Sequence, residues 1–415
     1  MNEEKFNIIL NHYAELIVKV CLNLQPEQRL FIYASPLEVA PLVRKVTEAA
    51  YKNGSKLVSI NWIDEQIDKI RLENAPKDSF EEYPNWEADG VIQSAERGDA
   101  FLYVWGKDPD LLKDVHPDDI SKVAQVHAKY LEKYNIQRGK GELQWLIVNP
   151  PTPAWAARVF PDDAQEDAEE KLWDAVIKAC RLDEENPVEA WTQQFENLGK
   201  RKEYLTDKQY SSLRLTAPGT DLSLGLPDRH IWEGGSPTTT SGISFVPNLP
   251  TEEVFTSPHR GKTSGVVSST KPLSFQGKLI ENFQFTFENG KVVDFSAEKG
   301  EEALQALLDT DEPAKFLGEV ALVPHQTPIS QLGLTFLNTL YDENASNHLA
   351  LGRSFRFCLE GGGVMSDEEY VAAGGNKSLI HVDFMIGSGE MNVDGMLSDG
   401  TMEAIMKDGE WAFEV

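Results

Sequence analysis

Residues 30–60 read LFIYASPLEVAPLVRKVTEAAYKNGSKLVSI, and this stretch decides the fold of the first half of the chain. The short apolar run Leu30–Ala34 predicts a buried strand. Residues 37–52 predict a helix that Asn53-Gly54 closes, and residues 57–60 predict a second strand. This order of strand, helix and strand is typical of a parallel sheet whose helices cross over its face.

The same alternation continues on both sides of this stretch. Before it, apolar residues recur at spacings of four and three, which predicts an amphipathic helix from Phe6, Leu10, Tyr13, Ile17, Val20 and Leu24. After it come a strand at residues 101–105, a helix around residues 120–134 and a strand at residues 145–148. We therefore expect an α/β domain with a mainly parallel sheet and helices on both faces.

The second half of the chain has a different character. Residues 155–204 are helical and acidic in pattern, and after about Lys202 turn signals separate alternating runs at Pro218-Gly219, Asn289-Gly290, Asp399-Gly400 and Asp408-Gly409. The chain of 415 residues is also longer than the roughly 250 to 300 residues that one core supports. We expect an N-terminal α/β domain over residues 1–201 and a C-terminal α+β domain with mostly antiparallel strands over residues 202–415.

Composition and charge exclude several classes of function. With 67 acidic and 39 basic residues, the formal net charge of -28 repels nucleic acid and anionic lipid, so neither nucleic acid nor a membrane is an expected partner. The first residues lack the features of a secretory signal, and no apolar run approaches the roughly 20 residues of a membrane span. Cys21, Cys180 and Cys358 fit neither a disulfide framework nor a thiolate zinc site. We expect a cytoplasmic protein.

Several common catalytic motifs are missing from the sequence. The chain contains no H-E-x-x-H, no G-x-S-x-G and no G-x-G-x-x-G after a predicted strand. Gly261-Lys262-Thr263 resembles the end of a phosphate-binding loop, but Thr256 stands where the first glycine is required and Pro258 interrupts the stretch. A nucleotide-binding loop is therefore not expected.

Residues 378–387 predict a strand with two unlike faces. Its apolar face is formed by Ile380, Val382, Phe384 and Ile386. On the other face, His381 and Asp383 lie two residues apart, so that both side chains point the same way. An imidazole beside a carboxylate suits a borderline metal such as zinc, cobalt or manganese. The alternative is a hydrogen-bonded His and Asp pair at a strand edge.

Three more residues are weak candidates when each is taken singly. Glu319 begins an otherwise apolar strand, where a buried carboxylate is costly unless something positive compensates it, although it can also reach solvent from the strand end. In residues 250–256, only one of Glu252 and Glu253 can face inward, and we choose Glu253. We interpret residues 344–352 as a short helix that carries His348, and a lone helical histidine is usually structural.

Five ordered strings tie these candidates together: PTEEVFTSPHR, DFSAEKG, GEVALVP, DENASNHLALG and HVDFMIG. The chain resembles the thermophilic aminopeptidase family over essentially its whole length. The resemblance implies a two-domain, dimeric exopeptidase that uses two divalent metal ions, zinc, cobalt or manganese, to remove N-terminal amino acids from peptides with a free N-terminus. Matched position by position, the metal ligands of the family fall on Glu253, Glu319, His348, His381 and Asp383.

The implied mechanism needs an acid that spans both ions and a group that carries protons. Two metal ions about 3.5 to 4 Å apart can hold a water molecule and lower its pKa. Glu319 is the candidate for the spanning acid. Glu252, His259 or a ligand carboxylate could carry the proton to the departing amine.

The chain departs from the family at one position near the candidate site. The family has a tyrosine seven residues after the histidine that corresponds to His348, and this chain has Phe355. If the missing hydroxyl stabilises the oxyanion, its loss costs roughly 100- to 1,000-fold in turnover. Two alternatives to an active aminopeptidase follow: a metal-binding member of the family with little or no activity, and a metallo-hydrolase that acts on another amide.

Overall fold

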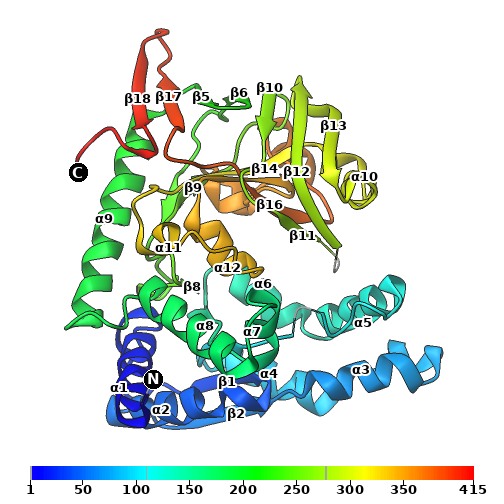
Figure 1. Ribbon diagram of the computed structural model, residues 1–415, viewed down its shortest axis with the longest axis vertical. Helices are drawn as coiled ribbons and strands as arrows, with labels where there is room; N and C mark the ends of the chain where they lie inside the picture. Colours follow the sequence, from blue (N-terminus) through cyan, green and yellow to red (C-terminus); the bar gives the residue numbers. More distant parts are fainter. Residues whose placement is uncertain (1, 109, 276–277) are drawn as a thin grey trace. The chain divides into compact units, whose positions relative to one another are not determined.

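The computed structural model describes residues 2–108, 110–275 and 278–415 (Figure 1). The chain forms two compact units, of which unit 1 comprises Met1–Thr192 and Ser236–Pro250, and unit 2 comprises Gln193–Gly235 and Thr251–Val415. The division expected from the sequence had a single boundary after residue 201. The chain instead changes unit after Thr192, after Gly235 and after Pro250, because residues 236–250 return to the first unit.

Unit 1 contains a five-stranded parallel sheet in the order β2-β1-β3-β4-β8. The strands are β1 (Leu30–Ser35), β2 (Val58–Trp62), β3 (Ala100–Trp105), β4 (Trp145–Val148) and β8 (Asn248–Leu249). The predicted parallel α/β region is confirmed. The strand β8 was not foreseen, because its two residues give no periodic signal and its partner β4 lies far away in the sequence.

The helices of unit 1 are α1 (Glu3–Leu16), α2 (Ala40–Lys52), α3 (Glu65–Asn74), α4 (Asn85–Glu96), α5 (Pro117–Tyr130), α6 (Glu132–Gly139), α7 (Pro153–Val159) and α8 (Gln165–Ala179). The first helix loses its α geometry after Leu16 and continues as a π-helix over Ile17–Cys21. The helix predicted around residues 120–134 is two helices that meet at Leu131.

Aromatic side chains fill one face of the parallel sheet. Tyr33 on β1 and Tyr103 on β3 are paired in register, and their rings stack with centroids 5.3 Å apart. Phe101 and Tyr134 pack in the same buried cluster. Since both faces of β1 carry large or apolar side chains, the strand is held by packing on either side, as expected for a parallel sheet.

The long helix α9 (Pro187–Lys208) runs from unit 1 into unit 2, which contains a nine-stranded antiparallel sheet. Its strands are β5 (Ser212–Ala217), β6 (Thr220–Gly225), β10 (Thr263–Ser268), β11 (Leu273–Phe275), β12 (Lys278–Glu288), β13 (Lys291–Lys299), β17 (Asn392–Met396), β18 (Met402–Lys407) and β19 (Glu410–Trp411). The predicted turns at Pro218-Gly219, Asn289-Gly290, Asp399-Gly400 and Asp408-Gly409 are confirmed, because each joins two paired antiparallel strands.

A second sheet of unit 2, the β14 sheet, is antiparallel and has the order β16-β15-β14-β9-β7. Its strands are β7 (Glu233–Gly234), β9 (Val254–Thr256), β14 (Leu317–Leu322), β15 (His348–Gly352) and β16 (His381–Met385). Unit 2 also contains the short helices α10 (Glu301–Leu308), α11 (Pro328–Gln331) and α12 (Thr339–Asp342), which Figure 1 labels, and α13 (Asp367–Ala372).

The prediction of a helix over residues 344–352 is wrong. His348 opens the strand β15, and only Glu343–Ala345 before it form a 3-10 turn. Leu349, Ala350 and Leu351 have good intrinsic helix propensity, but pairing with β14 and β16 on either side overrides it. The correction matters for the site, because a histidine on a strand projects from one face of a sheet.

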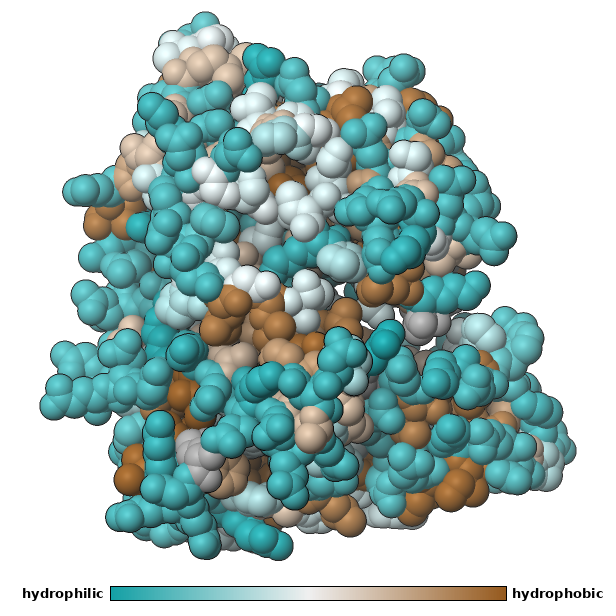
Figure 2. Space-filling model, in the orientation of Figure 1, coloured by the Kyte–Doolittle hydropathy of each residue, from teal (hydrophilic) through white to brown (hydrophobic). Residues whose placement is uncertain are grey.

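Hydrophilic residues cover most of the surface visible in Figure 2, with hydrophobic residues in scattered patches. This matches the excess of acidic over basic residues. Among the helices within the described ranges, none combines the length and the apolarity that crossing a bilayer requires.

Candidate metal centre

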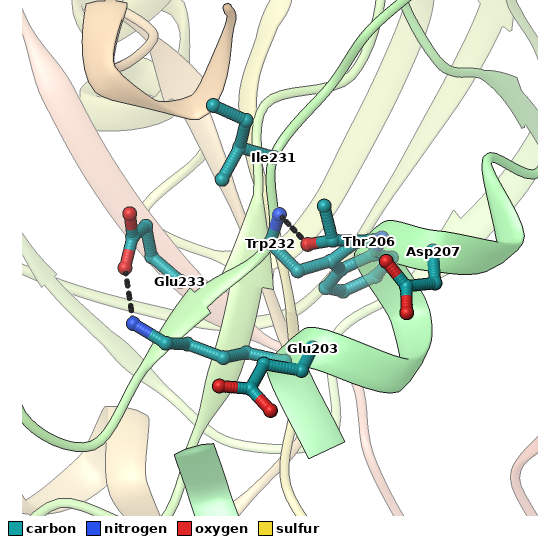
Figure 3. A pocket seen from close by; sticks show the side chains of 7 residues that line it. Glu203, Thr206, Asp207, Ile231, Trp232 and Glu233 are labelled. Carbon is teal, nitrogen blue, oxygen red and sulfur yellow. Dashed lines mark hydrogen bonds and ion pairs between the residues drawn. The ribbon is translucent and has the colours of Figure 1, made fainter. Parts of the chain in front are cut away.

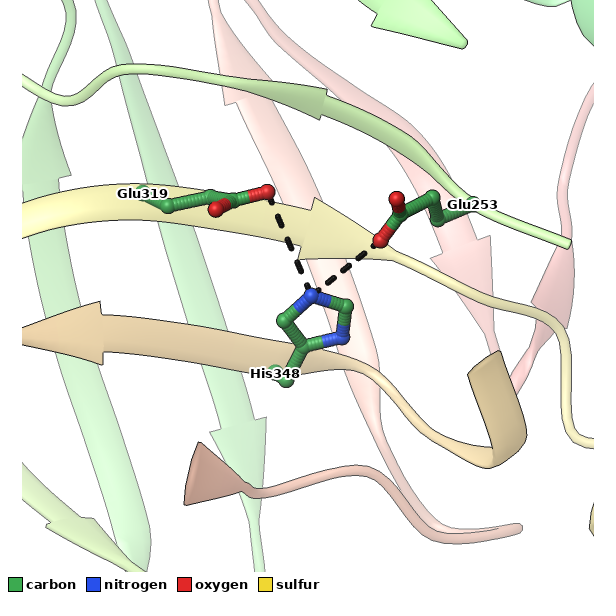
Figure 4. Close-up of side chains that lie close together, drawn as sticks. All are labelled: Glu253, Glu319 and His348. Carbon is green, nitrogen blue, oxygen red and sulfur yellow. Dashed lines mark ion pairs between the residues drawn. The ribbon is translucent and has the colours of Figure 1, made fainter. Parts of the chain in front are cut away.

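Two glutamate side chains and one histidine side chain meet in the β14 sheet. Glu253 precedes β9, Glu319 lies within β14, and His348 begins β15. The Nε2 atom of His348 is 3.2 Å from Glu253 Oε2 and 4.0 Å from Glu319 Oε1. Figure 4 shows the three side chains pointing toward one another. All three residues are buried.

A second group shares Glu319 with the first. The Nε2 atom of His381 is 3.0 Å from Glu319 Oε2 and 3.3 Å from Asp383 Oδ1. The two carboxylate oxygens of Glu319 therefore approach different histidines, Oε1 toward His348 and Oε2 toward His381. Both groups, Glu253 with Glu319 and His348, and Glu319 with His381 and Asp383, have potential ligand atoms within 4.8 Å of one another.

The register of the strands explains why these side chains share one face. Glu319 is paired with Ala350, which is paired in turn with Asp383. Paired residues of neighbouring strands lie on the same face of a sheet, and side chains two residues apart along a strand return to that face. His348 and His381, which lie two residues before Ala350 and Asp383 respectively, therefore project to the same side.

Small residues leave room between the candidate ligands. Ala321, Ala350 and Gly352 occupy the same face of β14 and β15. Gly352 also has a φ of +99°, and a Cβ atom built there would lie 2.3 Å from the carbonyl oxygen of Ile380. Only glycine meets both requirements, so this residue permits the pairing of β15 with β16 beside His381.

Backbone carbonyl groups fix the orientation of both histidines. The Nδ1 atom of His348 lies 3.1 Å from the carbonyl oxygen of Ser346, and Nδ1 of His381 lies 2.6 Å from that of Arg353. A carbonyl oxygen only accepts, so each Nδ1 carries the hydrogen and donates it. In the neutral imidazole the Nε2 lone pair then points at the carboxylates, which is the arrangement found in metal-ligating histidines.

Burial and the charges of the site shift the pKa of His348, His381 and Glu319. Burial alone would lower the pKa of His348, but Glu253 and the neighbouring carboxylates outweigh it and raise the pKa to about 10. Burial would likewise lower the pKa of His381, but Asp383 and Glu319 outweigh burial and raise the pKa to about 11. Burial raises the pKa of Glu319 to about 6. The site therefore demands positive charge, which protons supply when no other cation is bound.

The donor atoms fit divalent metal ions better than they fit each other. Among the described residues, Glu253 Oε2 and Asp383 Oδ1 are buried oxygens without a hydrogen-bond partner, although each lies within 3.3 Å of an imidazole nitrogen. A buried carboxylate oxygen without a hydrogen-bond partner costs folding free energy. A cation between the oxygen and the nitrogen would bind both, and mixed carboxylate and imidazole donors suit zinc, cobalt and manganese.

Glu252 and His259, the two proton carriers considered from the sequence, turn to other partners. A carboxylate oxygen of Glu252 accepts a hydrogen bond of 2.6 Å from Gln194 Nε2 on α9. The backbone N–H of Glu252 donates to Asn344 Oδ1, which anchors the chain directly before Glu253. His259 Nδ1 accepts a hydrogen bond from the backbone N–H of Gly261.

Phe355 lies against one of the candidate ligands. Its ring centroid is 4.8 Å from that of His381, and its backbone N–H donates to Ser257 Oγ. The ring therefore contacts the cluster at the side of His381 and Asp383, and it offers no hydrogen-bonding group there.

Glu343 is a residue that the sequence analysis did not single out. It lies in the 3-10 turn before β15, and its burial together with the charges of Glu253 and Asp383 raises its pKa well above the usual value. Its position in the string DENASNHLALG, five residues before His348, was the available signal. A carboxyl group with a raised pKa keeps its proton to a higher pH than an exposed carboxyl group does.

A separate pocket of about 350 Å³ lies beside α9 and β7 (Figure 3). Lys202 forms an ion pair of 3.0 Å with Glu233, and the backbone N–H of Trp232 donates to Thr206 Oγ1. The remaining lining residues are Glu203, Asp207 and Ile231. This pocket contains none of the five candidate ligands.

The chain is similar to known proteins over nearly its whole length. Residues 6–411 match the model of the family described as thermophilic metalloprotease (M29). The chain is 48% identical to Aminopeptidase 2 of Geobacillus stearothermophilus over 98% of both chains, and 46% identical to Aminopeptidase AmpS of Bacillus subtilis over 99% of this chain and 100% of that one.

Among solved structures, wild-type AmpT from Thermus thermophilus superposes with a TM-score of 0.91 at 40% identity, covering 98% of this chain and 99% of that chain. The α/β and α+β fold class is thereby confirmed, and membership of a metalloprotease family implies a divalent metal cofactor. The chain belongs to the thermophilic metalloprotease family M29 and is a hydrolase of the peptidase class.

Proposed function

We propose that this protein is an aminopeptidase that removes N-terminal amino acids from peptides with the help of two divalent metal ions. The observation that carries the proposal is the sharing of Glu319, whose Oε1 and Oε2 face different histidines. One carboxylate that serves two neighbouring groups suits a two-metal site. In this proposal Glu253, Glu319 and His348 would hold one ion, and Glu319, His381 and Asp383 would hold the other.

The two ions, when bound, would lower the pKa of a water molecule and polarise the scissile carbonyl group. The chain supplies the rest. Glu319 sets the spacing of the two groups, and the carbonyl oxygens of Ser346 and Arg353 keep each histidine Nε2 directed at the site. Burial of the three carboxylates keeps bulk water from competing for them.

Glu343 is the proposed proton carrier. Burial and the charges of Glu253 and Asp383 raise the pKa of its carboxyl group, which could then pass a proton to a departing amine and take one from water. The strongly acidic character of the chain also favours substrates with a positively charged free N-terminus.

The deciding experiment uses chelator-treated protein reloaded with zinc, cobalt or manganese. We expect it to release the first residue from a short peptide with a free N-terminus and to leave the N-acetylated form of the same peptide intact. Cleavage of both forms would favour a metallo-hydrolase of another amide. No release with any of the three metals would contradict the proposal.

A second candidate function is supported by Phe355, which has the ring of the family tyrosine without its hydroxyl group. A protein of this kind would bind metal and turn over slowly. Its signature would be full metal content together with turnover that rises in Phe355→Tyr. The expected homodimer and the cytoplasmic location stay predictions, and sedimentation of the purified protein would test the first of them.

A further inference from the structure

Three phenylalanine rings form a continuous aromatic surface next to the metal centre. Phe355 stacks on Phe357 with centroids 5.1 Å apart, and Phe255 meets these rings edge-on at 5.6 and 6.3 Å. Phe355 also contacts His381. We call Phe255, Phe355 and Phe357 the phenylalanine ledge. It leads from a candidate metal ligand to the solvent.

The register of the sheet places the start of the ledge on the face that carries the ligands. Phe255 on β9 is paired with Ala321, and Ala321 is paired with His348. These three residues therefore lie on one face of the β14 sheet. Phe357 ends the ledge and is 51% exposed. The other two rings are half-buried.

An exposed ring stacked on a half-buried ring differs from a solitary apolar residue on a surface. Single exposed apolar side chains are common and need no explanation. Here the rings adjoin each other and a buried charged cluster, so an apolar group brought to the cluster would find an apolar wall beside it. Aromatic pairs attract each other beyond what the burial of apolar area contributes.

We propose that the phenylalanine ledge binds the side chain of the N-terminal residue of the substrate, so that bulky apolar residues, aromatic ones above all, are preferred at that position. This inference rests on the proposed aminopeptidase function. The amine and the carbonyl group of the first residue must reach the metal centre, and its side chain leaves from the carbon between them. It is therefore the substrate side chain nearest to the metal centre, and the ledge adjoins that centre at His381.

The ledge also gives Phe355 a role of its own. A phenylalanine at this position keeps the wall fully apolar, whereas a tyrosine hydroxyl would place a polar group in it. Small residues such as glycine would leave the rings in contact with water. Acidic side chains would meet both the apolar wall and the negative charge of the cluster.

The kinetic test compares dipeptides X-Ala in which X is phenylalanine, leucine, alanine or glycine. We expect kcat/KM for phenylalanine and leucine to exceed that for glycine by about 10-fold or more, the range of a small apolar contact. In Phe357→Ala this ratio should fall several-fold. Leu379→Ala is the matched control, because Leu379 is an apolar side chain of the same unit that is 79% exposed and lies outside the ledge.

A binding measurement separates failure of this inference from failure of the proposed function. Calorimetry on the metal-loaded protein would compare L-phenylalaninol with ethanolamine, which share the amino alcohol group and lack a scissile bond. We expect tighter binding of L-phenylalaninol in the natural protein and loss of most of that difference in Phe357→Ala.

Tighter binding of L-phenylalaninol without any peptide turnover would count against the aminopeptidase function and would still support binding by the phenylalanine ledge. Turnover or binding without a preference for bulky apolar groups would overturn the ledge. So would a selectivity that follows the second residue of the peptide, or one that Leu379→Ala alters as much as Phe357→Ala.

Discussion

The parallel sheet of unit 1 and the β14 sheet of unit 2 each have five strands, yet they use their buried faces in opposite ways. On β1, Phe31, Tyr33 and Ser35 alternate with Leu30, Ile32 and Ala34, and packing involves both faces. On β15, Leu349 and Leu351 face one side, while His348, Ala350 and Gly352 face the other. β15 is fully buried and β1 nearly so.

The difference between these two strands shows where the molecule gives up stability for chemistry. A buried strand gains most when both faces are apolar, as in β1. One face of the β14 sheet instead combines small residues with carboxylates and imidazoles whose charges oppose burial. Such a face persists when a ligand compensates it, so the contrast can be tested by changing each sheet separately.

The largest effect is expected from Glu319→Gln. The amide cannot serve two ions, so we expect bound metal to fall to trace amounts and kcat/KM to fall on the order of 10⁵-fold or more. Elemental analysis and peptide release measure these two quantities. Retention of both metal ions would contradict the shared role of Glu319.

The same variant should make the metal-free protein more stable at pH 8. Burial raises the pKa of Glu319, so its ionised form weakens the fold above that pKa, and a neutral amide removes the penalty. Thermal unfolding after chelation measures this. A lower midpoint for Glu319→Gln than for the natural metal-free chain would contradict the stability argument.

A smaller loss, about 10²- to 10⁴-fold in kcat, is expected for Glu343→Gln. The amide cannot deliver the proton that the carboxyl group holds, whereas the five candidate ligands are unchanged. Metal content should therefore stay at its natural level. The exposed Glu360 provides the control Glu360→Gln, which should match the natural protein. A loss of metal in Glu343→Gln would assign this residue to metal binding instead.

Phe355→Tyr is expected to increase the activity of the site. A hydroxyl group at this position, next to His381, can donate a hydrogen bond to a developing oxyanion, and we expect kcat to rise by up to about 10²- to 10³-fold. Steady-state kinetics at constant metal content measure it. An unchanged kcat would show that the natural chain does not lack this donor.

The smallest effect is expected from adding two methyl groups to a buried alanine in each sheet. Ala350→Val and Ala34→Val both overpack a central strand, and we expect each to lower the free energy of unfolding by about 1–3 kcal/mol. Only Ala350 lies between Glu319 and Asp383, so only Ala350→Val should weaken metal binding, by about 10-fold. Equal metal affinity in both variants would remove the distinction between the sheets.

Features that depend on local chemistry could be predicted from the sequence. Residues 145–148 form the predicted strand, and Pro150-Pro151 marks its end. The pair Asn289-Gly290 forms the predicted turn because both residues tolerate a positive φ. The alternation that assigned His381 and Asp383 to one face also holds in β16.

Features that depend on distant partners could not be predicted. His348 was assigned to a helix because residues 344–352 have a polar start and a glycine end, and the two strands that pair with it lie far away in the sequence. Glu343 escaped notice because its neighbourhood of acids exists only after folding. The carbonyl group of Arg353, which orients His381, belongs to a residue whose side chain gives no hint of that role.

The return of residues 236–250 to the first unit has a consequence for the order of events during synthesis. The parallel sheet is complete only when Asn248 and Leu249 pair with β4, so a ribosome must deliver residues 193–235 of the other unit first. Until then β4 presents an open strand edge, which invites pairing with other chains. A protein truncated after Thr192 would keep this edge exposed permanently and should aggregate. A protein that ends at Pro250 retains β8 and should aggregate less.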